Sequence, residues 1–248
     1  MNIRINIDIS PSYSELRPFI ERIPTEFDAI GSLIYNGRNT LRSVHLDNGL
    51  DIVIKRYHKP NIFQRITYSF FGRSKAAKAM TAASTLTNRG FLTPDAIASI
   101  EIYSGALIRE YYFVCLHTSS APLYPVLVNN SEHPHELISS FAKFLVRLHK
   151  SGTMHGDLNL NNILLTPDNS FELIDTNRSQ FLDSEPSKNV CLNNLTRLTH
   201  NRFTLYRILK AYAESREWEP QVIITTIFRR LRNFERRRSI KHFFKRLI

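Results

Sequence analysis

Hydrophobic and polar residues alternate along much of the first half of the chain. Every second residue from position 3 to position 9 is isoleucine, with polar residues between, which predicts a half-buried strand. Residues 40–46 and 50–57 flank an Asn48-Gly49 turn, a pattern typical of a β-hairpin. Two further strands are expected at residues 96–103 and 106–116.

Two helices are expected between these strands. Ser12 with Glu15 three residues later forms a capping-box pattern, which predicts a helix that begins there and is stopped by Pro24. Residues 74–88 are rich in Ala and Lys and are followed by Gly90, so they predict a longer helix with a glycine stop.

The second half of the chain has mainly a helical pattern. Apolar residues recur at helical spacing over residues 137–148 and again from about residue 192. Two short apolar segments, 163–165 and 171–174, predict a small hairpin. A β-rich part followed by a mostly α part indicates an α+β fold. We expect an N-terminal lobe over residues 1–118 and a C-terminal lobe over residues 119–248.

Composition limits the class of protein. No apolar run approaches the roughly 18 to 20 residues that cross a bilayer, and the first ten residues lack a signal-peptide core. Cys115 and Cys191 are far apart, which favours neither a disulfide framework nor a zinc site. We therefore expect a cytoplasmic protein.

The formal net charge of +11 is concentrated at the end of the chain. Residues 226–248 hold nine basic residues against one acid, Glu235. Such a segment usually contacts an anionic partner, although a solvated charged helix gives the same pattern. Large apolar residues, among them Phe243 and Phe244, lie between the cations, which suits a helix at an anionic membrane surface.

The most informative polar residues lie around the predicted small hairpin. Asp157 and Asn162 are on the loop before it, and Asp175 follows its second strand. Two carboxylates and an amide offer the hard oxygen ligands that Mg²⁺ prefers. Turns also favour Asp and Asn for local reasons, but Lys55 on an apolar strand upstream resembles a lysine that pairs with nucleotide phosphates.

These residues, in this order, resemble the protein-kinase-like phosphotransferases, and more closely the lipopolysaccharide core kinases that phosphorylate Kdo or heptose sugars on lipid A. The resemblance runs from about residue 37 to residue 197. It rests on four segments: Ser74-Lys75-Ala76, Gly90-Phe91-Leu92-Thr93-Pro94, His155-Gly156-Asp157-Leu158-Asn159 and Ile174-Asp175-Thr176-Asn177-Arg178.

The resemblance implies a two-lobed protein-kinase-like fold and an ATP-dependent, Mg²⁺-dependent kinase. Asp157 would orient a sugar hydroxyl, with Asn159 beside it on the catalytic loop, and Asn162 and Asp175 would hold Mg²⁺. The implied nucleotide-binding residues are Lys55, Arg38, Leu116 and His117, the last two as hinge contacts with adenine. The implied partners are a lipid-linked sugar and, through the basic C-terminal helix, the cytoplasmic face of an anionic membrane.

Two departures keep other functions open. The phosphate-covering loop has only Gly37, and residues 74–88 contain no glutamate, so Thr81 stands where related kinases carry the acid that pairs with the strand lysine. The alternative is a catalytically weak, kinase-like module that binds nucleotide or lipid. A third hypothesis is a kinase-like protein that contacts RNA through its basic tail, but no RNA-binding motif is present, and nucleic acid is not an expected partner.

Overall fold

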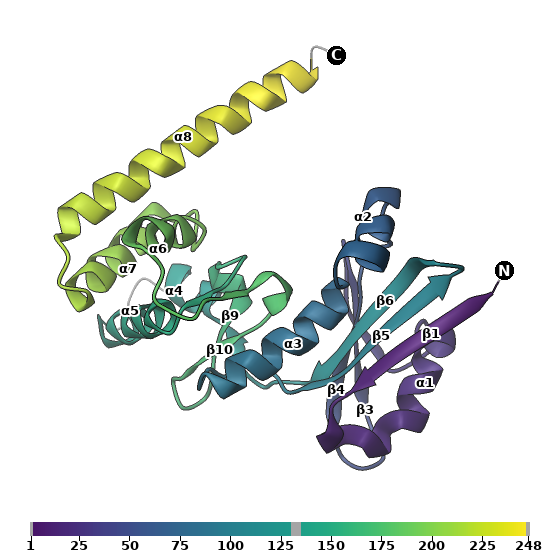
Figure 1. Ribbon diagram of the computed structural model, residues 1–248. Coiled ribbons are helices and arrows are strands. Elements are labelled where there is room, and N and C mark those ends of the chain that lie inside the picture. Colours follow the sequence, from purple (N-terminus) through teal and green to yellow (C-terminus); the bar gives the residue numbers. More distant parts are fainter. Residues whose placement is uncertain (1, 130–134, 247–248) are drawn as a thin grey trace. The chain divides into compact units, whose positions relative to one another are not determined.

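A six-stranded antiparallel sheet forms the first part of the computed structural model, which describes residues 2–129 and 135–246 (Figure 1). The strand order is β1-β5-β6-β4-β3-β2. Gly49, with φ +85°, makes the turn of the predicted hairpin, β3 with β4. The strands are β1 (Ile3–Ile9), β2 (Ser32–Asn36), β3 (Thr40–His45), β4 (Asp51–Arg56), β5 (Ala96–Ser104) and β6 (Leu107–Leu116).

One face of this sheet is covered by α1 (Arg17–Glu26). Ile20, Ile23 and Phe27 are buried there against Ile52 and Ile54 of β4 and their neighbours.

The prediction that Pro24 ends this helix is wrong. A 3₁₀ turn, η1 (Pro11–Leu16), precedes α1, and Pro24 lies inside the helix near its end. A proline there removes one backbone hydrogen bond, while buried Ile20 and Ile23 before it and Phe27 after it hold the last turn to the sheet.

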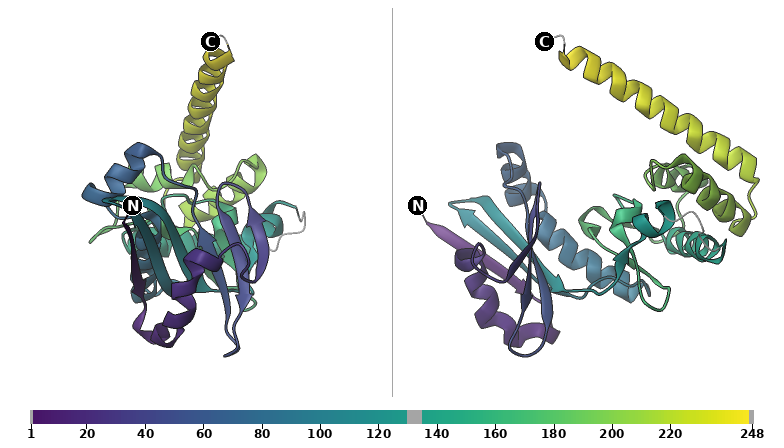
Figure 2. Two further views of the ribbon diagram at one scale, coloured as in Figure 1. Left: turned by 90° about the vertical axis from the view of Figure 1, so that its right-hand side faces the viewer. Right: turned by 180° about the vertical axis from the view of Figure 1, so that it is seen from behind.

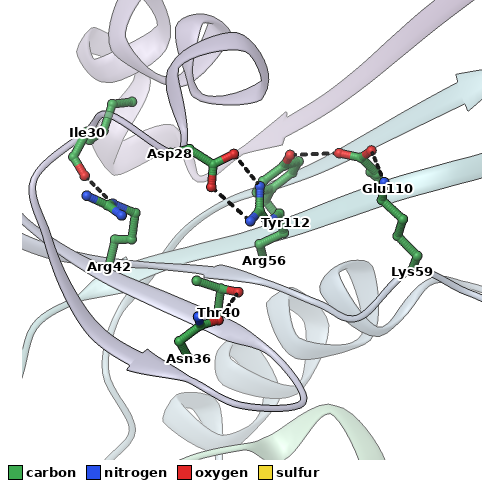
Figure 3. A network of polar contacts seen from close by, with 9 residues as sticks. All are labelled: Asp28, Ile30, Asn36, Thr40, Arg42, Arg56, Lys59, Glu110 and Tyr112. Atoms are coloured by element: carbon green, nitrogen blue, oxygen red, sulfur yellow. Dashed lines mark hydrogen bonds and ion pairs between the residues drawn. The ribbon is translucent and has the colours of Figure 1, made fainter.

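Polar contacts hold the chain after α1 to the same sheet (Figure 3). Arg56 donates two hydrogen bonds to Asp28, at 2.9 and 3.0 Å, and its guanidinium lies 4.3 Å from the ring centre of Phe27. Tyr112 continues the network by donating to Glu110 at 3.0 Å.

The opposite face carries α3 (Lys75–Asn88). Ser74 caps it by accepting from Ala77 N at 3.1 Å, and Gly90, with φ +74°, follows its end, so this prediction is confirmed. Because side chains alternate along a strand, Lys55 points to the α3 face, opposite to Ile54 and Arg56.

A short helical segment between β4 and α3 was not predicted. It consists of α2 (Ile62–Ile66) and one turn of π-helix, η2 (Thr67–Phe71). Asn61 and Gln64 form a reciprocal capping box at its start.

Helices make up most of the second part of the chain. His149 on α5 is fully buried and accepts at Nδ1 from the Tyr212 hydroxyl of α7 at 2.8 Å. Gly152, with φ +73°, follows the end of α5. The helices are α4 (Leu123–Val128), α5 (His135–Lys150), α6 (Lys188–Leu195), α7 (Arg202–Ser215) and α8 (Pro220–Arg246).

Short strands accompany these helices. The strand β7 (Ala121–Pro122) pairs with β9 (Ile163–Leu165), and β8 (Thr153–Met154) pairs with β11 (Gln180–Phe181). The predicted strand at 171–174 is β10 (Phe171–Leu173).

The last helix, α8, runs well beyond α7 in both views of Figure 2. Its first turns are buried through Ile223, Ile227 and Leu231, as the helical spacing predicts. Phe234, three residues after Leu231 and so at the same helical spacing, is 60% exposed, so the packed part of the helix ends before it. No helix in the described part of the chain is long and apolar enough to cross a membrane.

The chain divides into two compact units, and the fold is α+β as predicted. The first unit is residues 1–119 together with Glu172–Arg178, and the second is residues 120–171 with 179–248. We expected residues 172–178 in the C-terminal lobe, but they pack with the β-rich unit. Two hydrogen bonds tie this segment to the first unit: Leu173 N donates to Leu92 O at 2.9 Å, and Thr118 Oγ1 donates to Glu172 at 2.6 Å.

Candidate active site

The strand lysine and the aspartate after β10 form a direct ion pair in the first unit. Lys55 Nζ lies 2.5 Å from Asp175 Oδ1, and the two residues are 120 positions apart in the sequence. The Lys55 side chain is only 16% exposed, whereas the Asp175 side chain is 34% exposed. A lysine this buried requires a partner for its charge, and Asp175 provides it.

Asp175 is held by its own backbone and by Asn177. Its φ is +55°, a left-handed conformation that is uncommon outside glycine. Asn177 Nδ2 donates to the same Oδ1 atom at 2.8 Å, from the 3₁₀ turn η4 (Thr176–Arg178). A strained residue fixed by two donors is typical of a functional site.

Three further cations, Lys75, Arg38 and Arg178, lie around this pair. Burial lowers the pKa of Lys75 on the first turn of α3, and the positive charges of Arg38 and Arg178 lower it further, while Asp175 raises it. Neither Lys75 nor Arg38 forms an ion pair with a carboxylate among the described residues. The region therefore carries more positive than negative charge, which suits an anionic ligand.

Thr81 forms hydrogen bonds with Arg73 and with its own helix. Its hydroxyl accepts from Arg73 Nη1 at 2.7 Å and donates to Ala77 O at 3.1 Å. Two acids of the sheet, Glu101 and Glu110, are hydrogen-bonded to other residues: Glu101 accepts from Tyr103, and Glu110 accepts from Tyr112. The acid that pairs with Lys55 is Asp175, which answers the question raised by a helix without glutamate.

The second unit holds the predicted catalytic loop. Asn162 Nδ2 donates to the carbonyl oxygen of Asp157 at 2.9 Å, and Asn159 Nδ2 donates to the same oxygen at 3.2 Å. Asn159 Oδ1 accepts from Asn161 N at 2.9 Å and so caps the 3₁₀ turn η3 (Leu160–Asn162). Both polar groups of Asn159 bind backbone, so its visible role is to shape the loop around Asp157.

Hydrogen bonds from side chains of α5 and α6 hold this loop in place. His155 is 1% exposed, and its Nδ1 accepts from Asp157 N at 3.2 Å. Asn194 Nδ2 donates to His155 O at 2.8 Å, while Asn194 Oδ1 accepts from His149 Nε2 at 3.2 Å. The two buried histidines, His149 and His155, and the half-buried Asn194 between them thus link α5 and α6 to Asp157, a support that the sequence pattern did not reveal.

The predicted hinge residues follow or end β6. Leu116 N donates to Asp95 O at 2.9 Å, and His117 N donates to Asp51 O at 2.8 Å. Both amides are therefore bonded within the protein, and a hydrogen bond from either to adenine requires exchange of its present acceptor. Their role as adenine contacts stays a prediction.

The oxygen donors fit a hard divalent cation. Asp175 supplies a carboxylate and Asn162 an amide oxygen, the donor types of a Mg²⁺ site that is completed by substrate phosphates and water. In the described ranges, no group of three or more His, Cys, Asp or Glu side chains is suited to holding a metal. Asn162 belongs to the second unit and Asp175 to the first, and both stay predicted ligands.

Comparison with solved structures places the chain among kinase-like folds. It resembles WaaP, solved in complex with acyl carrier protein, with a TM-score of 0.61 and 18% identity over 92% of this chain and 98% of that one. At that identity the likeness shows a shared fold.

Two further structures are more distant. A divergent Toxoplasma kinase that lacks the glycine-rich loop gives a TM-score of 0.45 at 17% identity, over 83% of this chain and 74% of that one. WbdD gives 0.45 at 17% identity, over 80% of this chain and 45% of that one. At these scores neither carries a further argument.

Sequence comparison identifies the family. No curated protein sequence matches the chain. The lipopolysaccharide kinase (Kdo/WaaP) family matches residues 25–219, which include Lys55, Asp157, Asn162 and Asp175. With most of its length matched, the chain belongs to the lipopolysaccharide kinase (Kdo/WaaP) family and is a phosphotransferase.

Proposed function

We propose that this protein transfers the γ-phosphate of ATP to a hydroxyl of Kdo or heptose in the lipopolysaccharide inner core. The observation that carries the proposal is the buried Lys55–Asp175 ion pair, held by Asn177 in a chain of the Kdo/WaaP family. A lysine and an aspartate held together in a partly buried position, with an amide fixed on the carboxylate, favour a functional role.

Lys55 would bind the nucleotide phosphates. It is a point charge on a strand whose position is fixed by pairing on both sides, with β3 and with β6. Arg38, on the turn before β3, would add a second cation and offset the lack of a glycine-rich loop. In phosphoryl transfer, such positioning and charge stabilisation account for most of the catalysis.

Asp175 and Asn162 would hold Mg²⁺. Bound there, the ion would neutralise phosphate charge and orient the γ-phosphate. Asn177, by donating to Asp175, keeps that carboxylate oriented whether or not the ion is present.

Asp157 would orient the acceptor. Its carboxylate accepts the proton of the sugar hydroxyl as the hydroxyl oxygen bonds to phosphorus and the bond to the ADP oxygen breaks. Asn159 and His155 act as positioning residues, because their hydrogen bonds go to the loop rather than to a reacting group.

The acceptor is lipid-linked, so the enzyme would work at the cytoplasmic face of an anionic membrane, with the basic C-terminal helix as one contact. Each Lys or Arg near such a surface contributes about 1 kcal/mol, screened by salt. Deleting residues 236–248 should lower sedimentation with anionic vesicles and leave ATP binding unchanged. Equal binding by the truncated chain would remove the helix from the membrane contact.

The decisive experiment is phosphate transfer from γ-labelled ATP to purified lipid A–core, with peptide and RNA as control acceptors. We expect label on the lipid A–core alone and Mg²⁺-dependent turnover. ATP binding with no transfer to any sugar acceptor would instead favour the catalytically weak binding module.

A further inference from the structure

The α2–η2 segment (Ile62–Phe71) has one face bound to the sheet and another exposed to solvent. On the bound face, Arg65 Nε donates to Ile108 O at 3.0 Å, and Ser69 Oγ accepts from Ile108 N at 2.8 Å. Tyr68 packs edge-on against Tyr111 with ring centres 5.9 Å apart. These contacts fix the segment, so its outward side chains are presented by a rigid element.

The outward face is strongly apolar. Phe63 is 79% exposed and Phe71 is 82% exposed. Single exposed apolar residues are ordinary, but several on one short segment mark an interaction site. The exposed members are Ile62, Phe63, Ile66, Phe70 and Phe71.

The chain around this face is positively charged in sequence, while two acids of the sheet, Asp8 and Glu101, line the same hollow as Tyr68 and Arg73. Residues 52–94 contain eight Lys or Arg and no Asp or Glu. Arg73 binds only the neutral hydroxyl of Thr81, and Lys78 Nζ lies 6.0 Å from the ring centre of Tyr68. Neither cation forms an ion pair with a carboxylate in the part of the chain that the structure describes, so both are available to an anionic partner.

We propose that the α2–η2 segment docks on an anionic lipid surface, with Phe63, Phe70 and Phe71 inserted at the boundary between head groups and acyl chains. Large apolar side chains beside unpaired cations are what such an interface selects. The inference rests on the proposed function, since a kinase of a lipid-linked sugar meets its acceptor at a membrane, but its test requires neither ATP nor sugar.

The test is sedimentation of the full chain with vesicles of 30% phosphatidylglycerol in phosphatidylcholine, and with pure phosphatidylcholine. The variant Phe63→Ser/Phe70→Ser/Phe71→Ser should bind the anionic vesicles at least about tenfold more weakly, because the inserted aromatic area is lost. The matched control is Phe203→Ser, which removes a similarly exposed phenylalanine of the second unit. It should bind as the wild type does.

A second measurement reports insertion directly. The wild type has one tryptophan, Trp218, so Phe71→Trp adds a single emitter on the proposed face. Brominated phosphatidylglycerol should quench that added emission and leave the wild-type signal unchanged. Undiminished vesicle binding by the triple variant, or an unquenched Phe71→Trp, overturns the proposal. So does a wild type that ignores vesicles but binds a purified acidic carrier protein through these phenylalanines.

Discussion

The two halves of the candidate active site are built in opposite ways. The hydrogen bonds to the Asp157 carbonyl and across η3 join residues at most five positions apart, such as Asn162 to Asp157 O. The Lys55–Asp175 pair joins residues 120 positions apart, and it exists only when the sheet and residues 172–178 are both folded. A local motif thus carries the candidate base, and a long-range contact carries the candidate phosphate site.

Asp157→Ala tests the local half and should have the largest effect. Removing a positioned general base should lower the rate of phosphate transfer by about 10²- to 10⁴-fold. ATP affinity should change little, because the loop's hydrogen bonds use the Asp157 backbone and are retained. Comparing kcat with the ATP dissociation constant checks this. Full activity in a folded variant would take Asp157 out of the mechanism.

Asp175→Asn tests the long-range half. The substitution removes an anionic ligand and leaves the buried Lys55 charge without its partner. We expect Mg²⁺-dependent ATP binding to weaken by about 10²-fold, since losing one member of a buried pair costs a few kcal/mol. Titration of ATP with and without Mg²⁺ measures it. An unchanged affinity in both titrations would contradict the metal assignment.

Lys75→Gln tests whether Lys75 contributes to ATP binding in addition to the cations around it. Lys75 shares the surroundings of Arg38, Arg178 and Asp175, so losing its charge should raise the KM for ATP by about tenfold while kcat stays within a factor of two. Lys78→Gln on the same helix is the matched control and should leave the KM unchanged. Equal effects from both variants would mean that Lys75 acts only through the general charge of the helix.

The last effect is on stability and not on catalysis, and it concerns His149, which is hydrogen-bonded to Asn194 next to the catalytic loop. Burial lowers the pKa of His149 to about 4, so in the folded protein this histidine is neutral between pH 4 and its ordinary value near 6.5. The unfolded chain takes up a proton in that window, so stability falls as the pH falls from 6.5 to 4, by about 2 to 3 kcal/mol.

Denaturant unfolding at several pH values measures this slope. A His149→Gln variant should be less stable at pH 7 but should lose less stability between pH 6.5 and 4. The same slope in both proteins would assign the acid sensitivity to other groups.

Much of the fold could be predicted from the sequence. The β3–β4 hairpin and α3 follow from the Asn48-Gly49 turn and from the Ser74 cap with its glycine stop, because these signals are local. Pro24 was misjudged because burial of Ile20 and Ile23 decides where α1 ends. The α2–η2 segment could not be predicted because a helix is recognised by apolar residues that recur on its buried face. Here the large apolar residues lie on the exposed face instead.

The site divides in the same way. The grouping of Asn159 and Asn162 around Asp157 could be predicted from their spacing, since the hydrogen bonds that join them are between residues close in sequence. The partner of Lys55 could not be predicted, because Glu101 and Glu110 are nearer in sequence than Asp175. Only the packing of residues 172–178 with the β-rich unit brings Asp175 to Lys55. Lys75 belongs to the Ser74-Lys75-Ala76 motif, but its electrostatic interaction with Arg38 and Arg178 arises only in the folded structure.

The membership of Glu172–Arg178 in the first unit has a consequence for how the protein is made. A ribosome that has synthesised residues 1–119 has not yet supplied Asp175, so the nascent β-rich unit holds a Lys55 ammonium with no counter-charge. At 5 to 20 residues per second, the missing segment arrives about 3 to 12 seconds later. A released fragment that ends at residue 119 should therefore protect its sheet from protease less well than a fragment that continues through residue 178.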